Sequence, residues 1–243
     1  MRLFNSIIED IKKFITARIQ TGNLLEYIVQ DEISWPKAGP TDIVFKSETG
    51  IELGNPKDES VSFLAWTDDQ SLVRDGLISL VGPDIGKMKS GSLPFGKIVL
   101  ISGSGFNEEN CYDRFREMDL SRYELSLKGY MMRAVSQYMR EWSRVSREAV
   151  ENGFSFSILG SALSQKLKEL HYVDAVEILF VTSSAEDVRE LKKTGDRFLQ
   201  YINAMTKMVE EMDFQCESCE FQEICDEAEE LRGMRRSLID KGK

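Results

Sequence analysis

Three of the four cysteines of this chain lie within ten residues near the end of the sequence: Cys216, Cys219 and Cys225. A C-x2-C pair lets one tight turn direct two thiolates at a single ion, and a third thiolate after five more residues can close over the same point. Glutamates, among them Glu217 and Glu220, surround these cysteines, which is unlike the setting of thiols that pack as small apolar side chains. The segment is therefore predicted to bind a metal.

The identity of the metal depends on the fourth ligand. Cys111 would complete an all-thiolate set with Cys216, Cys219 and Cys225, which suits a [4Fe–4S] cluster. The lone histidine, His171, would instead complete a Cys3His zinc site. We favour the iron–sulfur cluster with Cys111 and keep zinc as the alternative; His171 also suits a plain turn before a strand.

Composition limits the class of protein. The chain has 243 residues, 31 basic and 41 acidic side chains, a net charge of −10 and 42% hydrophobic residues. This balance indicates a globular protein of one or two domains and argues against nucleic-acid binding. The longest apolar runs are far too short to span a membrane, and no secretory signal is evident. We therefore expect a cytoplasmic protein with reduced cysteines.

The first 40 residues are predicted to form an N-terminal helical segment and a linker. Apolar side chains such as Ile7, Ile11 and Ile15 repeat at helical spacing, so residues 3–19 should form an amphipathic helix. Its polar face mixes both signs of charge, which disfavours a membrane surface. Two alternatives stay open, packing on its own domain and docking on a partner subunit.

The remaining chain predicts an α+β fold, a mixed sheet with packed helices. Residues 41–212 form its main domain, and residues 213–243 form a cysteine-rich metal loop and a C-terminal helix. Short apolar runs separated by turns predict strands at 42–46, 60–66, 77–81, 97–102 and 176–182. Helical spacing predicts mostly helix across 111–150, then helices at 156–170, 185–212 and from about 226.

Five short segments resemble, in their order and spacing, the central α+β domain of the nickel-containing acetyl-CoA synthase family. That family includes the beta subunit of the acetyl-CoA decarbonylase/synthase complex with carbon monoxide dehydrogenase. The segments are residues 51–57, 80–85, 92–96, 142–149 and 176–182. The resemblance covers about residues 51–191 and extends by position into the cysteine loop.

The resemblance implies specific roles. In that family, the region after this domain holds a [4Fe–4S] cluster bridged to a two-nickel site, where a methyl group, CO and coenzyme A are joined. By position, Cys216 and Cys219 resemble the first two cluster ligands and Cys225 the third. The Cys-Gly-Cys tripeptide that holds the distal nickel has no counterpart in this sequence, so nickel is not expected. Trp142 and Arg144 match the family's W-x-R pattern, associated with coenzyme A binding; packing and a surface charge are the alternative.

Two functions follow from these expectations. The first is an iron–sulfur-binding, shortened relative of acetyl-CoA synthase with an accessory, electron-transfer or assembly role beside a CO dehydrogenase or corrinoid protein. The alternative is a catalytic acetyl-CoA synthase subunit, an acyltransferase completed by another chain, or a zinc-stabilised interaction module. The cysteine spacing also resembles that of some iron–sulfur nucleases, but the acidic charge opposes that function.

Overall fold

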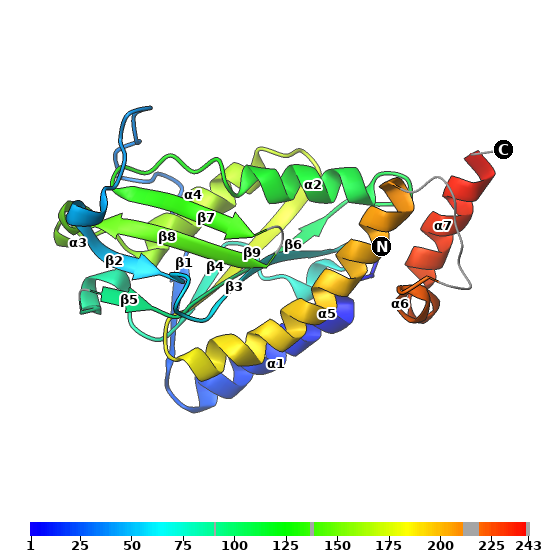
Figure 1. Ribbon diagram of the computed structural model, residues 1–243, viewed down its shortest axis with the longest axis horizontal. Helices are drawn as coiled ribbons and strands as arrows, with labels where there is room; N and C mark the ends of the chain where they lie inside the picture. The colour runs from blue at the N-terminus through cyan, green and yellow to red at the C-terminus, as the bar shows by residue number, and fades with distance from the viewer. Residues whose placement is uncertain (90, 137–138, 211–218, 242–243) are drawn as a thin grey trace.

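The computed structural model of the chain describes residues 1–89, 91–136, 139–210 and 219–241. Its strands form two mixed sheets, and helices pack around them, which confirms the predicted α+β class (Figure 1). The large sheet has the order β1 (Leu24–Ile28), β4 (Leu77–Val81), β9 (Val173–Val181), β6 (Phe95–Gly103), β3 (Ser60–Thr67). The small sheet has the order β5 (Gly91–Leu93), β2 (Thr49–Leu53), β8 (Arg140–Ser146), β7 (Tyr130–Ser136).

Two neighbouring strands at one end of the large sheet, β6 and β3, are completely buried. β3 and β6 pair in parallel from Ser60 opposite Phe95 to Thr67 opposite Ser102, and every residue of both strands is buried. Continuous burial of this kind is typical of strands packed on both faces. The short apolar runs in the sequence therefore located these two strands correctly.

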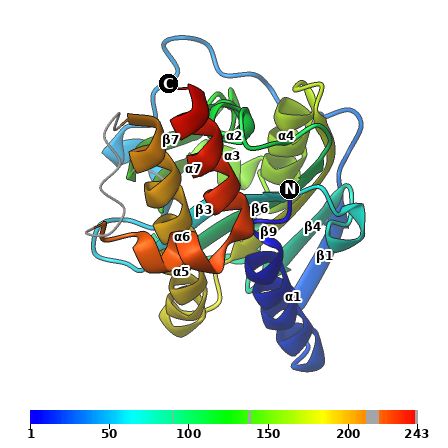
Figure 2. The ribbon, with the colours of Figure 1, turned by 90° about the vertical axis from the view of Figure 1, so that its right-hand side faces the viewer.

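Helices supply the cover on both sides of this sheet. α1 (Asn5–Gln20) lies beside α5 (Ala185–Glu210), and α4 (Phe156–Lys168) packs on the side of the sheet opposite to α1 (Figures 1 and 2). The remaining helices are α2 (Cys111–Ser121), α3 (Arg147–Glu151), α6 (Gln222–Glu227) and α7 (Glu229–Lys241). None of the helices described is long and apolar enough to cross a membrane.

The N-terminal helix packs on its own chain. Ile7, Ile8 and Ile11 of α1 are fully buried, and the helix contacts α5 and β3. Phe4, just before the helix, lies 4.4 Å from the Trp66 ring of β3 between ring centroids. The predicted amphipathic helix is confirmed, and of the two alternatives it is the internal packing that the structure shows.

The two sheets meet where β3 runs beside the start of β8. The Ser62 amide of β3 donates a hydrogen bond to the Met139 carbonyl, at 2.8 Å. Beneath this junction the Lys97 ammonium of β6 forms an ion pair with the Glu141 carboxylate of β8, and both side chains are fully buried. The Arg122 guanidinium, also buried, donates to Ser62 Oγ at 3.2 Å. We call Lys97, Glu141 and Arg122 the buried charge cluster.

Hydrogen bonds complete the environment of the Glu141 carboxylate. Tyr130 and Ser143 donate to its Oε1 atom at 3.0 and 2.9 Å. Burial alone would raise the pKa of Glu141, but the charge and hydrogen bond of Lys97, together with Ser143 and Arg122, outweigh it and lower that pKa. Burial lowers the pKa of Lys97, against the opposing effect of Glu141.

Three local predictions were wrong, the first at residues 42–46. This segment is not a strand, and a short 3-10 helix, Lys46–Glu48, begins at its end. Side chains satisfy the local backbone in place of a neighbouring strand, because Asp42 accepts from the Gly39 amide at 2.8 Å and Glu48 accepts from the Phe45 amide at 3.1 Å. Such local bonds compete with sheet pairing.

The second wrong prediction is the helical stretch at 111–150. α2 begins there as expected, but β7 and β8 then form an antiparallel hairpin before the short helix α3. The apolar residues used for the helical pattern include Tyr130 and Ala134, which are four residues apart on β7, and a spacing of four fits a strand as well as a helix. The spacing of apolar residues along the chain therefore could not distinguish the period of a helix from that of a strand. Toward the chain end, the single helix predicted from about residue 226 is two helices, α6 and α7.

Replacement of one member of the buried charge cluster should be strongly destabilising. In Glu141→Gln, the Lys97 charge would stay buried without its carboxylate, whereas Arg122 would keep its ion pair with Asp119. We expect a loss of about 3–5 kcal/mol in the free energy of unfolding by urea denaturation. Glu186→Gln is the control, because the Glu186 side chain is 76% exposed. The double variant Lys97→Met/Glu141→Gln should lose less than the sum of the two single variants.

The contribution of Glu141 to the free energy of unfolding should also depend on pH. Because its pKa is lowered in the folded state, its contribution is present above the ordinary glutamate pKa and is lost as the pH falls through the folded value. The stability difference between the wild type and Glu141→Gln should therefore narrow below about pH 4. A constant difference between pH 7 and pH 3.5 would contradict this linkage.

Candidate functional site

One face of the small sheet carries a stack of two arginines on a tryptophan. The Arg144 guanidinium carbon lies 5.3 Å from the centre of the Trp142 ring, and that of Arg133 lies 5.6 Å from it. These separations are within the range of cation–π contacts. We call Arg133, Trp142 and Arg144 the arginine–tryptophan face.

β-strand geometry explains how this face forms. Trp142 and Arg144 are two residues apart on β8, so their side chains point to the same side. Glu141 and Ser143 alternate with them, are fully buried and lie on the other side. Arg133 lies on β7 where the pairing register shifts, between Met132 and Ala134. An irregularity of this kind can redirect a side chain, and here Arg133 extends over Trp142.

An ion pair with the neighbouring strand fixes Arg144. Glu52 of β2 lies directly opposite Arg144, and Arg144 Nε donates to Glu52 Oε1 at 2.8 Å. Asn55 donates to the other carboxylate oxygen of Glu52 at 2.9 Å. Burial alone would raise the pKa of Glu52, but the hydrogen bonds from Asn55 and Arg144 outweigh it and lower the pKa. Arg144 is only 7% exposed, so its guanidinium is held in one orientation.

The Trp142 ring has an unused polar group. Its Nε1 atom is buried and has no hydrogen-bond acceptor among the residues that the structure describes. A buried donor without a partner costs free energy comparable to a lost hydrogen bond. Together with two guanidinium groups, this arrangement suits a ligand that has both an anionic group and an apolar or aromatic part.

The sequence identified only part of this face. The W-x-R pattern selected Trp142 and Arg144, although on a predicted helix. It missed Arg133 and Glu52, which come from the two strands on either side of β8. A strand assignment with period two would have placed Trp142 and Arg144 on one face, but the residues opposite them depend on strand pairing.

The predicted metal ligands are placed unequally. Cys216 lies outside the described residues. Cys219 is partly exposed just before α6, and Cys225, on α6, is 6% exposed. The described part of the C-terminal cysteine loop and α6 therefore offers two thiols, and thiolate ligands suit iron–sulfur clusters and zinc. Within the described ranges no group of three or more potential ligands is gathered at one point. The metal site stays a prediction.

Cys111 lies in a different setting. It is the first residue of α2, is fully buried, and its Sγ atom lies 3.5 Å from the Met234 sulfur of α7. Burial raises the pKa of the Cys111 thiol to about 12. α7 follows the cysteine loop in the chain, so the fold brings Cys111 against the C-terminal segment. Its role as the fourth ligand is not tested by this contact.

His171, the alternative fourth ligand, is exposed in the turn before β9. Its ring lies 5.3 Å from that of Tyr172, edge to face. Tyr172 in turn donates a hydrogen bond to Glu117 of α2 at 2.7 Å. The described contact of His171 is therefore with its neighbour in the chain.

The buried Cys111 and the partly exposed Cys219 should differ in the reactivity of their thiols. At pH 8 in the native, metal-depleted protein, Cys111 should react with iodoacetamide at least about 100-fold more slowly than Cys219, because a buried thiol with a raised pKa is protonated and inaccessible. Peptide mass spectrometry with isotopic labels would measure each site, and labelling in urea is the control that all sites can react. Equal rates for Cys111 and Cys219 would contradict the packing of α7 over Cys111.

Comparisons with known proteins place this site in a family. Residues 37–188 match the family model described as the CO dehydrogenase/acetyl-CoA synthase complex beta subunit. This match includes Cys111, Trp142 and Arg144 but ends before Cys216, Cys219 and Cys225.

Individual relatives agree with the family model. The chain is 28% identical over 211 residues to the carbon monoxide dehydrogenase/acetyl-CoA synthase subunit alpha of Moorella thermoacetica, covering 84% of this chain and 28% of that protein. It is 31% identical over 156 residues to the acetyl-CoA decarbonylase/synthase complex subunit beta of Methanothermobacter thermautotrophicus, covering 60% and 32%. This chain thus spans about a third of the length of these relatives. Since the family model matches well over half of the chain, the chain belongs to the CO dehydrogenase/acetyl-CoA synthase complex beta subunit family.

Proposed function

We propose that this chain is an accessory subunit of a CO dehydrogenase/acetyl-CoA synthase type of complex that binds coenzyme A on the arginine–tryptophan face. The observation that carries the proposal is the stack of Arg133 and Arg144 on Trp142, with the Trp142 Nε1 group unpaired among the described residues. Coenzyme A combines anionic phosphates with an adenine ring and an amide chain. The two guanidinium groups suit the anionic phosphates. The tryptophan ring and its N–H suit the adenine ring and the amide chain.

The similar proteins support the part of the proposal that makes this chain a subunit of a complex. The name of the Methanothermobacter relative describes that protein as a subunit of a complex. We therefore propose CO dehydrogenase or corrinoid protein subunits as partners of this chain. The catalytic alternative, in which another chain completes an acetyl-CoA synthase site, predicts nickel and CO or acetyl exchange only when that other chain is present.

The second part of the proposal concerns the cysteines. We propose that Cys216, Cys219 and Cys225 hold a [4Fe–4S] cluster, with Cys111 as the candidate fourth ligand. Support comes from the thiol chemistry and spacing of the C-terminal cysteines. When bound, such a cluster would supply electron transfer, and the described residues Cys219 and Cys225 would anchor it from α6 and the turn before it.

Coenzyme A binding tests the first part. Titration of the protein with coenzyme A, followed by tryptophan fluorescence, should saturate, and Arg144→Ala should weaken binding by about 10-fold or more, since a charge-assisted hydrogen bond contributes about 1.5–3 kcal/mol. Arg236→Ala on the exposed side of α7 is the matched control and should bind as the wild type does. Absence of saturable binding in the wild type would reject the proposal.

Metal content tests the second part. Protein purified without oxygen should contain about four irons and four acid-labile sulfides per chain, and Cys219→Ser should lose them. Zinc alone would support the alternative of a zinc-stabilised interaction module. Nickel and CO exchange that appear only after a completing chain is added would support the catalytic alternative. Cys111→Ser decides the fourth ligand, because an intact cluster in this variant would remove Cys111 from the set.

A further inference from the structure

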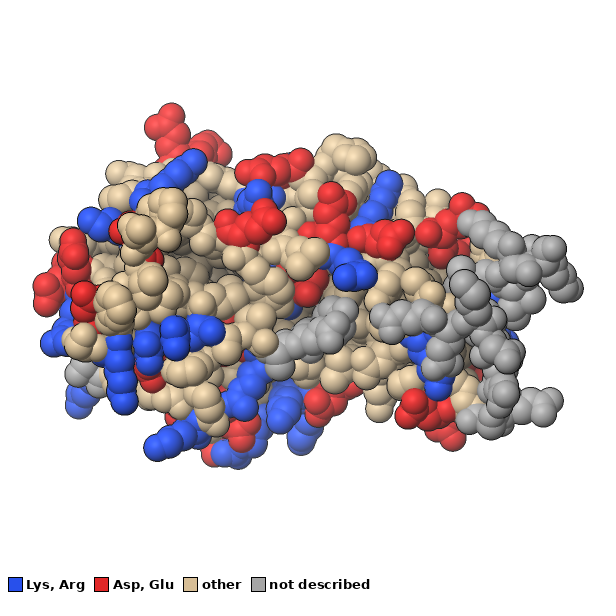
Figure 3. All heavy atoms as spheres, turned by 45° about the horizontal axis from the view of Figure 1, so that its top comes forward, with Lys and Arg blue, Asp and Glu red and all other residues tan. Residues whose placement is uncertain are grey.

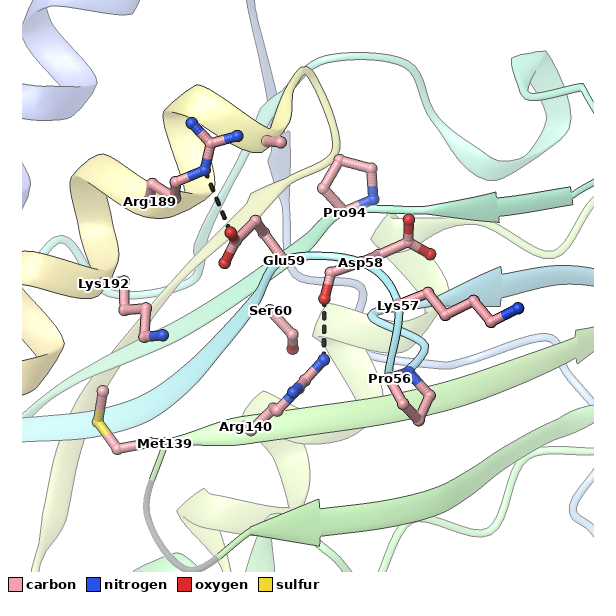
Figure 4. A pocket seen from close by; sticks show the side chains of 11 residues that line it. Pro56, Lys57, Asp58, Glu59, Ser60, Pro94, Met139, Arg140, Arg189 and Lys192 are labelled. Carbon is pink, nitrogen blue, oxygen red and sulfur yellow. Dashed lines mark hydrogen bonds and ion pairs between the residues drawn. The ribbon is translucent and has the colours of Figure 1, made fainter.

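A cavity of about 560 Å³ opens between the β2–β3 loop, the start of β8 and the first turns of α5. Four basic side chains line it: Lys57, Arg140, Arg189 and Lys192. In Figure 4, Lys192 extends from α5 toward Ser60 and Met139, while Arg140 extends from β8 toward the loop above it. We call this cavity the α5 pocket.

The α5 pocket is positively charged in an acidic protein. Its four basic groups and two carboxylates, Asp58 and Glu59, give a local charge of +2, whereas the whole chain has a net charge of −10. On the molecular face drawn in Figure 3, Lys and Arg side chains gather along the lower left edge, apart from most of the acidic groups. An anion near this pocket would thus be attracted against the overall repulsion of the chain.

The two carboxylates of the pocket are already engaged. Asp58 accepts a hydrogen bond from Ser92 Oγ, and Glu59 forms an ion pair with Arg189 at 3.1 Å. Lys192, in contrast, has no ion-pair or hydrogen-bond partner among the described residues, and its neighbours in the pocket include Met139. An ammonium group directed into a cavity without a counter-ion is available for a ligand.

Arg140 is positioned for the same purpose by the backbone. Its Nη2 atom donates to the carbonyl oxygens of Asn55 and Asp58, at 3.2 and 2.8 Å. These two bonds hold one edge of the Arg140 guanidinium in place. They do not neutralise its positive charge, because both acceptors are neutral carbonyl oxygens. The first residue of α5, Ala185, also lines the pocket, but Glu186 and Asp187 in the first turn of the helix offset its positive end. The field in the pocket therefore comes from the basic side chains.

The pocket and the arginine–tryptophan face lie near each other along β8. Arg140 and Trp142 are two residues apart on β8 and therefore lie on the same side of the strand, about 7 Å apart along it. A single ligand of nucleotide size can thus contact both. We propose that the α5 pocket is a phosphate-binding site, which receives the phosphorylated end of the ligand whose other parts contact Trp142 and Arg144. This inference rests on the proposed coenzyme A binding for the identity of the ligand.

Calorimetric titration with three probes tests the pocket: adenosine 3′,5′-bisphosphate, pantetheine and inorganic pyrophosphate. Lys192→Ala should weaken binding of coenzyme A and of both phosphorylated probes by about 10-fold at low salt, as expected for one lost charge-assisted contact, and should leave pantetheine binding unchanged. Lys193→Ala is the matched control, because Lys193 follows Lys192 on α5 and is exposed as Lys192 is, but it does not line the pocket. Lys192→Arg should retain binding.

The outcomes separate this inference from the proposed function. Pyrophosphate binding that Lys192→Ala weakens and Lys193→Ala does not would support the pocket even if coenzyme A does not bind. Coenzyme A binding that is unaffected by Lys192→Ala would overturn the pocket and leave the arginine–tryptophan face intact. Equal losses in Lys192→Ala and Lys193→Ala would also overturn it, because they would indicate general electrostatic attraction.

Discussion

The ion pair between Lys97 and Glu141 is the interaction on which the arrangement of the two sheets depends. Lys97 belongs to β6, which lies between β9 and β3 in the large sheet, and Glu141 belongs to β8 of the small sheet. Two fully buried opposite charges require each other, because either one alone in the interior is costly. The pair therefore specifies which residues of β8 face inward and where β8 lies relative to the large sheet.

This constraint extends to the outer face of the same strand. Since Glu141 and Ser143 are committed to the interior, Arg140, Trp142 and Arg144 must face the other way. A shift of one residue in register would bury the arginines and expose Glu141. The same pair that joins the sheets thus holds the proposed ligand-binding residues in place, with Glu52 fixing Arg144 from the neighbouring strand. Structural and ligand-binding demands are met by alternating residues of one strand.

The C-terminal segment is joined to this domain through packing rather than through the small sheet. α6 and α7 pack against α5, and Met234 of α7 covers the Cys111 thiol. α5 is also the helix that supplies Arg189 and Lys192 to the α5 pocket. One long helix therefore contacts both the region of the C-terminal cysteines and the pocket, although at different turns. The proposed ligand-binding site and the proposed metal site therefore both lie against α5, but they have no residue in common.

The sequence by itself determined the α+β class, the amphipathic helix α1, the fully buried strands β3 and β6, and the family, because these depend on local periodicity and on ordered motifs. It also selected Trp142 and Arg144. Only the tertiary structure decided that these two residues lie on a strand, since spacings of four residues fit both periods. It likewise decided that Arg133 and Glu52 join them, and that Arg140 and Lys192 share a pocket. Those pairings join strands and helices distant in the sequence, and local patterns carry no information about which distant elements come to lie side by side.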